Sequence, residues 1–327
     1  MQPASQPASQ PGAMAMGPRA ISSAKLTLGL LLALIIAAPH GAHGVKLTTE
    51  TKTFGHAVKN GALPPVNATD AETVVFEHSC TTAPCTINQI HVPSIYPKNK
   101  ADWAWQNGVI RFYIDDEVTA SVDLKLLELS WVSEWASPAH SSLQPGASGG
   151  QYDNRGLPWG IADFGHTASS GGVSSTIRIP FAKSVRVTLQ APPKTYTTSV
   201  YWVIVRGLEN SAVTLGELEL PPTARLRLHR VNTTLNNGEL VTLAAAPAGI
   251  SGALVGTKFD ANGHSDGFLE ACMRFYPNAA SAAKNTTPIF LSSGAEDYFL
   301  SASYFDEGEF ISPNSGLTYK QGGAIGS

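Results

Sequence analysis

Charged side chains are scarce in this chain of 327 residues, because Asp, Glu, Lys and Arg make up 14% of it where soluble domains average about a quarter. Neither sign dominates, since 22 Lys and Arg stand against 25 Asp and Glu. This even balance excludes a strongly basic nucleic-acid-binding protein or a polyacidic one. The hydrophobic content of 43% is too high for a disordered chain. We therefore expect a folded protein without a nucleic-acid partner.

The composition also offers little for long surface helices. Gly and Pro contribute 30 and 22 residues, and both destabilise helix interiors while favouring turns. Residues 225–231 alternate polar and apolar side chains, as a strand with one wet face must. Further strands are expected at residues 74–77, 111–114, 117–124, 175–181, 185–189, 201–205, 240–245, 253–259, 268–276 and 289–291. Short strands at close spacing without intervening helices predict an all-β fold of the β-sandwich type.

No apolar run reaches the ~20 residues that a membrane-spanning helix needs. Residues 26–38 form a 13-residue apolar stretch that follows Arg19 and Lys25 and precedes small residues ending at Gly44. This layout is typical of a secretory signal peptide. We expect a low-complexity leader and signal peptide over residues 1–44, a secreted product and no membrane contact after cleavage. An uncleaved signal anchor that tethers the protein to a membrane is the alternative.

Cysteine is rare, with three residues in the whole chain. Cys80 and Cys85 enclose four residues that include Pro84, which suits a small disulfide-closed turn in an oxidising compartment. Zinc binding by the two thiolates and His78 is a weaker alternative, because no fourth ligand is evident. Cys272 is left unpaired. We expect no metal.

Three sequons accompany the leader. The acceptor residues are Asn67, Asn232 and Asn285, each followed two positions later by Thr. A secreted protein can carry N-linked glycans at such positions when they are exposed.

The chain divides near Pro221 and Pro222. We expect one sandwich over residues 45–222 and a second over residues 223–327. Residues 137–172 interrupt the strand rhythm with a stretch rich in Gly, Ser and Pro that also holds Arg155 and Trp159. A loop of this length in a compact domain is more often functional than idle.

Two further motifs are more typical of loops and turns than of catalytic sites. Residues 146–150 fit a nucleophile-elbow pattern, but Pro145 precedes them and a polar segment follows, so the required strand and helix are absent. Asp115, Asp116 and Glu117 form a carboxylate cluster where a tight turn between strands would fall. We interpret it as a solvated hairpin turn, with a catalytic cluster as the alternative.

A second pair of acidic segments lies near the end of the chain. Asp266-Gly-Phe-Leu-Glu270-Ala-Cys272 places Glu270 among apolar residues on an expected strand, and Glu296 and Asp297 follow some twenty residues later. Two facing carboxyl groups are what glycosidic cleavage needs, one to attack the sugar and one to protonate the leaving oxygen. The spacing alone points to this chemistry only weakly.

These residues resemble those of a known family, domain of unknown function 2961, now counted as glycoside hydrolase family 172. Its hallmark run is matched by Gly294-Ala-Glu-Asp-Tyr-Phe299, and its Phe-Leu-Glu-Gly segment by Phe268-Leu-Glu-Ala271. Weaker similarity lies in residues 111–117, 179–185 and 252–256. The resemblance covers about residue 70 to the end of the chain.

The resemblance implies a double jelly-roll β-sandwich that assembles into homo-oligomers, trimers or larger. It also implies a retaining hydrolase of α-linked fructofuranosides or D-arabinofuranosides that needs no cofactor. Glu270 would then be the nucleophile and Glu296 the acid/base. Asp297 and Tyr298 of the hallmark run, with Arg155 and Trp159 of the long loop, are the candidate substrate-binding residues.

This chain departs from the family in two ways. Ala271 and Cys272 stand where many members have Gly-Asp, which puts the identity of the sugar in question. Members also continue past the position of Ser327, so we expect the second sandwich to be incomplete. A carbohydrate-binding or self-assembling jelly-roll protein without catalysis is the alternative function, because sandwiches host many functions.

Overall fold

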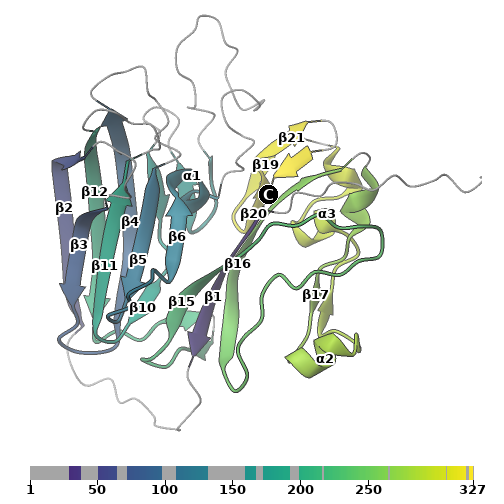
Figure 1. Cartoon of the computed structure of the whole chain (residues 1–327), viewed down its shortest axis with the longest axis horizontal. Coiled ribbons are helices and arrows are strands. Elements are labelled where there is room, and N and C mark those ends of the chain that lie inside the picture. The colour runs from purple at the N-terminus through teal and green to yellow at the C-terminus, as the bar shows by residue number, and fades with distance from the viewer. Residues whose placement is uncertain are drawn as a thin grey trace, which may run out of the picture.

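The computed structural model describes residues 29–37, 51–64, 72–97, 108–131, 159–166, 172–191, 199–215, 217–263, 266–306, 308–321 and 324–326. It contains 48% strand and 10% helix in several antiparallel sheets, which confirms the all-β prediction. Figure 1 shows two lobes side by side: the first is purple to teal, and the second is mainly green to yellow but also contains the purple strand β1 (Gly29–Ala37).

Two antiparallel sheets build the first lobe. The larger sheet runs in the order β2 (Lys52–Leu63), β12 (Ser199–Glu209), β4 (Cys85–Pro97), β9 (Val173–Ser175), β8 (Phe164–His166) and β7 (Trp159–Gly160), with β10 (Ile179–Phe181) also paired to β4. The smaller sheet runs in the order β3 (Thr73–Ser79), β11 (Ser184–Gln190), β5 (Val109–Ile114) and β6 (Val122–Lys125). The one-turn helix α1 (Leu126–Leu129) follows β6.

The core of the first lobe lies between these sheets. Val203 and Val205 of β12 and Val185 and Val187 of β11 are fully buried in one apolar cluster. Each pair is separated by one residue that points the other way, as the two-residue period of a strand requires. Residues 201–205 of β12 form a continuous apolar run, which is typical of a strand buried on both faces. Ile204 is only half-buried, however, so this strand buries one face fully.

The second lobe has one main sheet. Its order is β15 (Arg225–Val231), β1 (Gly29–Ala37), β16 (Ser251–Asn262), β22 (Ala324–Gly326) and β21 (Tyr319–Gln321). Two-stranded ribbons are made by β13 (Thr214–Leu215) with β14 (Leu218–Glu219), β17 (Arg274–Phe275) with β18 (Phe290–Leu291), and β19 (Phe310–Ser312) with β20 (Ser315–Leu317). The short helices are η3 (Asp266–Glu270), α2 (Ala279–Ala283), α3 (Ala295–Tyr298) and η4 (Ser303–Phe305).

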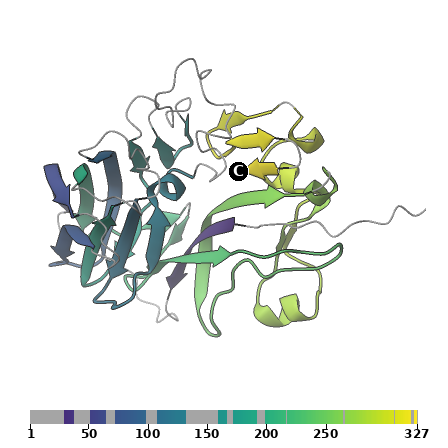
Figure 2. The same cartoon turned by 45° about the horizontal axis from the view of Figure 1, so that its top comes forward.

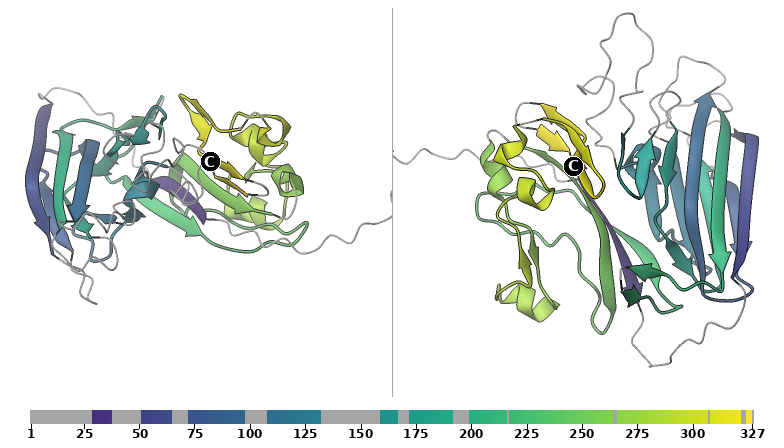
Figure 3. Two further views of the ribbon diagram at one scale, coloured as in Figure 1. Left: turned by 90° about the horizontal axis from the view of Figure 1, so that it is seen from above. Right: turned by 180° about the vertical axis from the view of Figure 1, so that it is seen from behind.

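A second apolar cluster packs these short elements onto β16. Phe259 and Ala261 of β16 contribute to it, together with Leu269, Phe299 and Phe305. This cluster therefore seats η3, α3 and η4 on one face of the main sheet. The views in Figures 2 and 3 show these elements on the side of the sheet away from the first lobe.

β1 lies inside the predicted signal peptide. It pairs antiparallel with both neighbours, so that Leu32 faces His229 of β15 and Thr257 of β16. Among the strands that the structure describes, β1 lies between β15 and β16 and pairs with both. The apolar stretch is thus long enough to complete the sheet, and secretion with cleavage near Gly44 stays a prediction.

Some predicted strands are absent. Residues 268–276 contain the end of η3 and only a two-residue strand, and residues 240–245 form no ladder. Both segments are largely apolar but do not alternate strictly. Their side chains pack against the second apolar cluster although their backbones pair with few or no strands. Residues 117–124 are a turn until β6 begins at Val122, and residues 175–181 are divided between β9 and β10.

The two lobes are tied together by β15. Its Arg225 and Arg227 pair with Asp115 and Glu117 of the first lobe, the latter at 2.6 Å, and Arg230 pairs with Glu128 of α1 at 2.8 Å. Figure 1 shows β15 at the boundary between the lobes. Among the helices that the structure describes, none has the length and hydrophobicity that a membrane crossing requires.

Candidate active site

The structure brings the segments of Glu270 and Glu296 together. Glu270 is the last residue of η3 and Glu296 lies in the first turn of α3. Two hydrogen bonds join Met273 and Ser292: the Met273 amide donates to the Ser292 side-chain Oγ at 2.8 Å, and the Ser292 amide donates to the Met273 carbonyl oxygen at 3.0 Å. Cys272 Sγ adds a contact of 3.4 Å to the Ser293 carbonyl oxygen. These contacts hold η3 beside α3.

Gly294 is required by this close approach. A methyl group on its α-carbon would lie 2.8 Å from Glu296 Oε2 and 2.9 Å from the Leu269 carbonyl oxygen. Contacts this short do not occur for real β-carbons, so a larger residue would push η3 away from α3. The glycine of the hallmark run therefore sets how near the two acidic residues can come.

Glu296 is the buried member of the pair. Glu296 is 7% exposed, and its Oε2 atom is buried without a hydrogen-bond partner. Burial raises the pKa of the Glu296 carboxyl, its own backbone amide opposes this rise, and the charges of Asp297 and Glu270 add to it. A carboxyl in such surroundings retains its proton at higher pH than an exposed one, as a general acid must.

Glu270 is the exposed member. Its carboxylate Oε1 accepts a hydrogen bond from the Tyr304 hydroxyl of η4. The expected strand does not form, so Glu270 and Cys272 do not share a strand face. Cys272 is instead a half-buried free thiol between the Glu270 and Ser293 carbonyls.

Asp297 and Tyr298 differ in their surroundings. Asp297 is exposed and its Oδ2 accepts from the Ser293 hydroxyl. Tyr298 stacks on Phe275 at a ring distance of 6.0 Å, and its hydroxyl shares a hydrogen bond of 2.9 Å with Thr257 Oγ1. Burial raises the pKa of the Tyr298 hydroxyl. The Tyr298 ring thus packs against neighbouring residues, and Asp297 is the member of this pair open to solvent.

Of the two candidate substrate-binding residues in the long loop, the structure describes only one. Arg155 lies outside the described residues, and Trp159 begins the short strand β7. The turn after β7 reaches the second lobe, since the Ala162 amide donates to the Pro313 carbonyl at 2.8 Å beside β19. This contact connects the segment of Trp159 to the lobe that carries both acidic residues.

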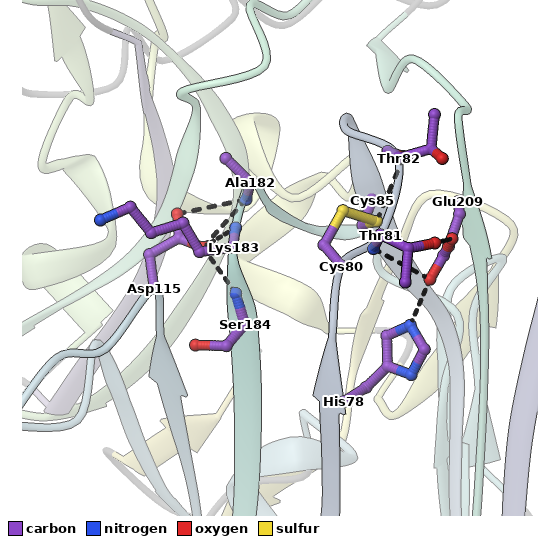
Figure 4. The surroundings of a disulfide bond; sticks show 10 residues. All are labelled: His78, Cys80, Thr81, Thr82, Cys85, Asp115, Ala182, Lys183, Ser184 and Glu209. Carbon is purple, nitrogen blue, oxygen red and sulfur yellow. Dashed lines mark hydrogen bonds and ion pairs between the residues drawn. A yellow bond between two sulfur atoms is a disulfide. The ribbon is translucent and has the colours of Figure 1, made fainter.

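Cys80 and Cys85 form a disulfide in the first lobe, which leaves no thiolate pair for zinc. Figure 4 shows Glu209 beside the closed turn, where it accepts a hydrogen bond from the Thr81 hydroxyl and contacts His78 Nε2 at 2.8 Å. The Thr81 hydrogen bond is the main cause that lowers the pKa of Glu209. No group of three His, Cys, Asp or Glu within the described ranges could hold a metal ion.

The carboxylate cluster at residues 115–117 is not simply solvated. Asp115 is buried and accepts amide hydrogen bonds from Ala182, Lys183 and Ser184, as Figure 4 also shows. Its ion pair with Arg225 joins the lobes. The predicted solvated turn fits Asp116, which is exposed. Asp115 instead has a structural role that the neighbouring residues in the sequence do not indicate.

Two of the three sequons are described. Asn232 and Asn285 are both exposed, and Asn285 Oδ1 accepts from Arg274 and Tyr276. Asn67 lies outside the described residues. Exposure meets the physical requirement for glycan attachment at the first two.

Sequence reasoning missed Tyr304, Thr257 and Lys320. Tyr304 contacts Glu270, Thr257 holds Tyr298, and Lys320 donates to the Tyr304 carbonyl at 2.8 Å. None of them stands in a motif with recognisable spacing. Only the folding of β16, η4 and β21 around α3 brings them to the site.

The arrangement offers a buried carboxyl with a raised pKa beside an exposed carboxyl, and such a pair suits two-step acid and nucleophile chemistry. No protein-family model matches the chain, and no curated protein is significantly similar to it.

Proposed function

We propose that this chain is a secreted retaining exo-glycoside hydrolase that acts on α-linked furanosides, D-arabinofuranosyl or fructofuranosyl, and that it belongs to glycoside hydrolase family 172. One observation carries the proposal. Glu296 is buried with a raised pKa and lies close enough to Glu270 for that charge to affect it. Two carboxyl groups whose surroundings separate their proton affinities are typical of an acid and nucleophile pair.

The reaction assigns one role to each carboxyl. Glu270 attacks the anomeric carbon, and the bond to the leaving oxygen breaks as that oxygen takes the proton of Glu296. Glu296 then removes a proton from water, whose oxygen displaces Glu270 from the anomeric carbon and restores both carboxyl groups. In this mechanism the two groups stand about 5–5.5 Å apart. Asp297 and Tyr298, with Arg155 and Trp159 of the long loop, are the residues that we propose for substrate binding.

The fold and the assembly belong to the same proposal. The lobes correspond to two jelly-roll sandwiches, and among the described residues the main sheet of the second packs against short helices and ribbons. The chain forms trimers or larger homo-oligomers, needs no cofactor and carries N-linked glycan. These properties follow the family resemblance and the leader at residues 1–44.

The test is hydrolysis of aryl α-D-arabinofuranosides and α-fructofuranosides by the complete protein, with the product anomer followed by NMR. We expect release with retained configuration. Glu270→Gln abolishes turnover with every leaving group. Glu296→Gln lowers kcat/KM by about 10²–10⁴-fold for poor leaving groups, spares good ones in the first step and is partly rescued by azide. Inverted product or unchanged rates in both variants would refute the assignment.

A non-catalytic carbohydrate-binding protein is the second candidate, and one feature of the first lobe favours it. A hollow beside β2, β12 and β4 is lined by Thr53, Phe54, Asn88, Gln89, Thr176, Arg206, Gly207 and Leu208. The amide, hydroxyl and guanidinium groups among these residues can bind sugar hydroxyls. Oligosaccharide binding that Gln89→Ala removes, in a protein without hydrolase activity, would select this candidate.

A further inference from the structure

The segment after α3 has an unusual backbone. Leu300, Ser303, Tyr304 and Phe305 all have positive φ, at 61°, 50°, 57° and 57°. This left-handed conformation is unfavourable for residues other than glycine, because their β-carbon crowds the following carbonyl oxygen. Such conformations persist only where the surrounding structure imposes them, and they gather at functional sites. The position of Tyr304 is thus enforced by its neighbours.

Two contacts enforce it. The Phe305 side chain is fully buried in the second core. Lys320 Nζ donates to the carbonyl oxygens of Tyr304 and Phe305 at 2.8 and 2.9 Å, and it pairs with Asp306 at 3.2 Å. A single ammonium group therefore binds both carbonyls of the left-handed turn. The result is a rigid support for the Tyr304 side chain.

That support directs the Tyr304 hydroxyl to Glu270, where it donates to Oε1. The Glu270 side chain lies at the end of a short helix and is exposed, so it has few packing contacts to fix its rotamer. A hydrogen bond to one oxygen holds the plane of the carboxylate and leaves Oε2 for another partner. The left-handed turn can hold the Tyr304 hydroxyl in this position, because the buried Phe305 side chain anchors η4 in the second core.

We propose that Tyr304 is a positioning residue for Glu270, held by Lys320, and that it fixes the carboxylate so that Oε2 faces the anomeric carbon of a bound furanoside. This inference rests on the proposed function for the role of Glu270. Tyr304 acts through Glu270 and transfers no proton to the sugar. Attack geometry controls rate steeply, since small misplacements of a reacting group are costly.

The test compares Tyr304→Phe with Tyr276→Phe. Tyr276 is the matched control, because its hydroxyl donates to Asn285 at 2.7 Å on the neighbouring ribbon. We expect Tyr304→Phe to lower kcat by about 10- to 100-fold with KM changed less than about threefold. The loss should be the same for good and poor leaving groups, unlike the loss in Glu296→Gln, because the attacking group is affected. Tyr276→Phe should match the wild type.

Crystal structures of the two variants supply a readout that needs no activity. The Glu270 carboxylate should occupy one rotamer in the wild type and Tyr276→Phe, and several in Tyr304→Phe. A wild-type kcat with a single Glu270 rotamer in Tyr304→Phe would overturn the inference while leaving the hydrolase proposal intact. If the wild type hydrolyses no furanoside, the proposed function fails and the role of Tyr304 in attack fails with it. The crystal structures then still decide whether Tyr304 orders Glu270.

Discussion

At the scale of single residues, two adjacent acidic side chains differ in their burial. Glu296 and Asp297 are adjacent acids on α3, yet Glu296 points into the packed side of the helix and Asp297 into solvent. The sequence places both in one hallmark run and cannot say which is buried, because a helix of four residues has no periodicity to read. The raised pKa of Glu296 arises from that packing.

Glu296 should make stability depend on pH in an unusual direction. Because its pKa is raised in the folded protein, its contribution is present below the unfolded pKa of about 4.3 and is lost as pH rises through the folded pKa. Glu296→Gln stays neutral, so it should be more stable than the wild type at pH 8 and gain nothing at pH 4.

Urea unfolding at both pH values measures this difference. Glu219→Gln is the control, since Glu219 is exposed, and it should follow the wild type at each pH. A Glu296→Gln variant that is less stable than the wild type at pH 8 would contradict the burial of an uncompensated carboxyl.

At the scale of elements, alternation predicted strands well and apolar content predicted them poorly. β15 and β11 have strict polar and apolar periodicity and lie within about two residues of their expected bounds. Residues 268–276 are mostly apolar, but the 3₁₀ helix η3 ends at Glu270, and Cys272 contacts the Ser293 carbonyl oxygen just before α3. The acidic pair could be predicted from the hallmark run, but its support by η4 and β21 comes from tertiary packing.

The position of β1 in the second sheet predicts what removal of residues 1–44 does to the protein. If signal cleavage removes residues 1–44, β15 and β16 lose the strand that both pair with, and unpaired edges promote association. A chain that begins at Val45 should therefore self-associate, whereas the full chain made without export should show less of it. Light scattering after size-exclusion chromatography measures the difference.

Mass spectrometry of the exported protein identifies which form exists outside the cell. We expect an N-terminus near Val45, a Cys80–Cys85 disulfide and glycan on Asn67 or Asn232. A monodisperse product from Val45 onward that melts cooperatively would show that the second lobe folds without β1.

At the scale of the whole molecule, the lobes are joined by the arginines of β15 and the acids opposite them. Asp115 is the most buried of these acids, with an exposed side-chain fraction of 7% against 67% for Asp116. Removing one partner of a buried ion pair costs more than the pair contributes, because the other charge stays buried.

Asp115→Asn should thus lower the free energy of unfolding by about 3–5 kcal/mol. The matched change Asp116→Asn should cost less than about 1 kcal/mol, because its contact with Lys183 is exposed. Urea unfolding of both variants tests this, and equal losses would mean that Asp115 does not link the lobes.

The central claim concerns Glu270 and Glu296 as nucleophile and acid/base. Its most direct measurement is the intact mass of Glu296→Gln after reaction with an aryl α-D-arabinofuranoside that has a good leaving group. The account predicts one pentosyl unit added to the protein and mapped by peptide analysis to Glu270, because the first step proceeds and the second lacks its base. Hydrolysis that persists in Glu270→Gln, or a sugar attached to any other residue, would contradict it.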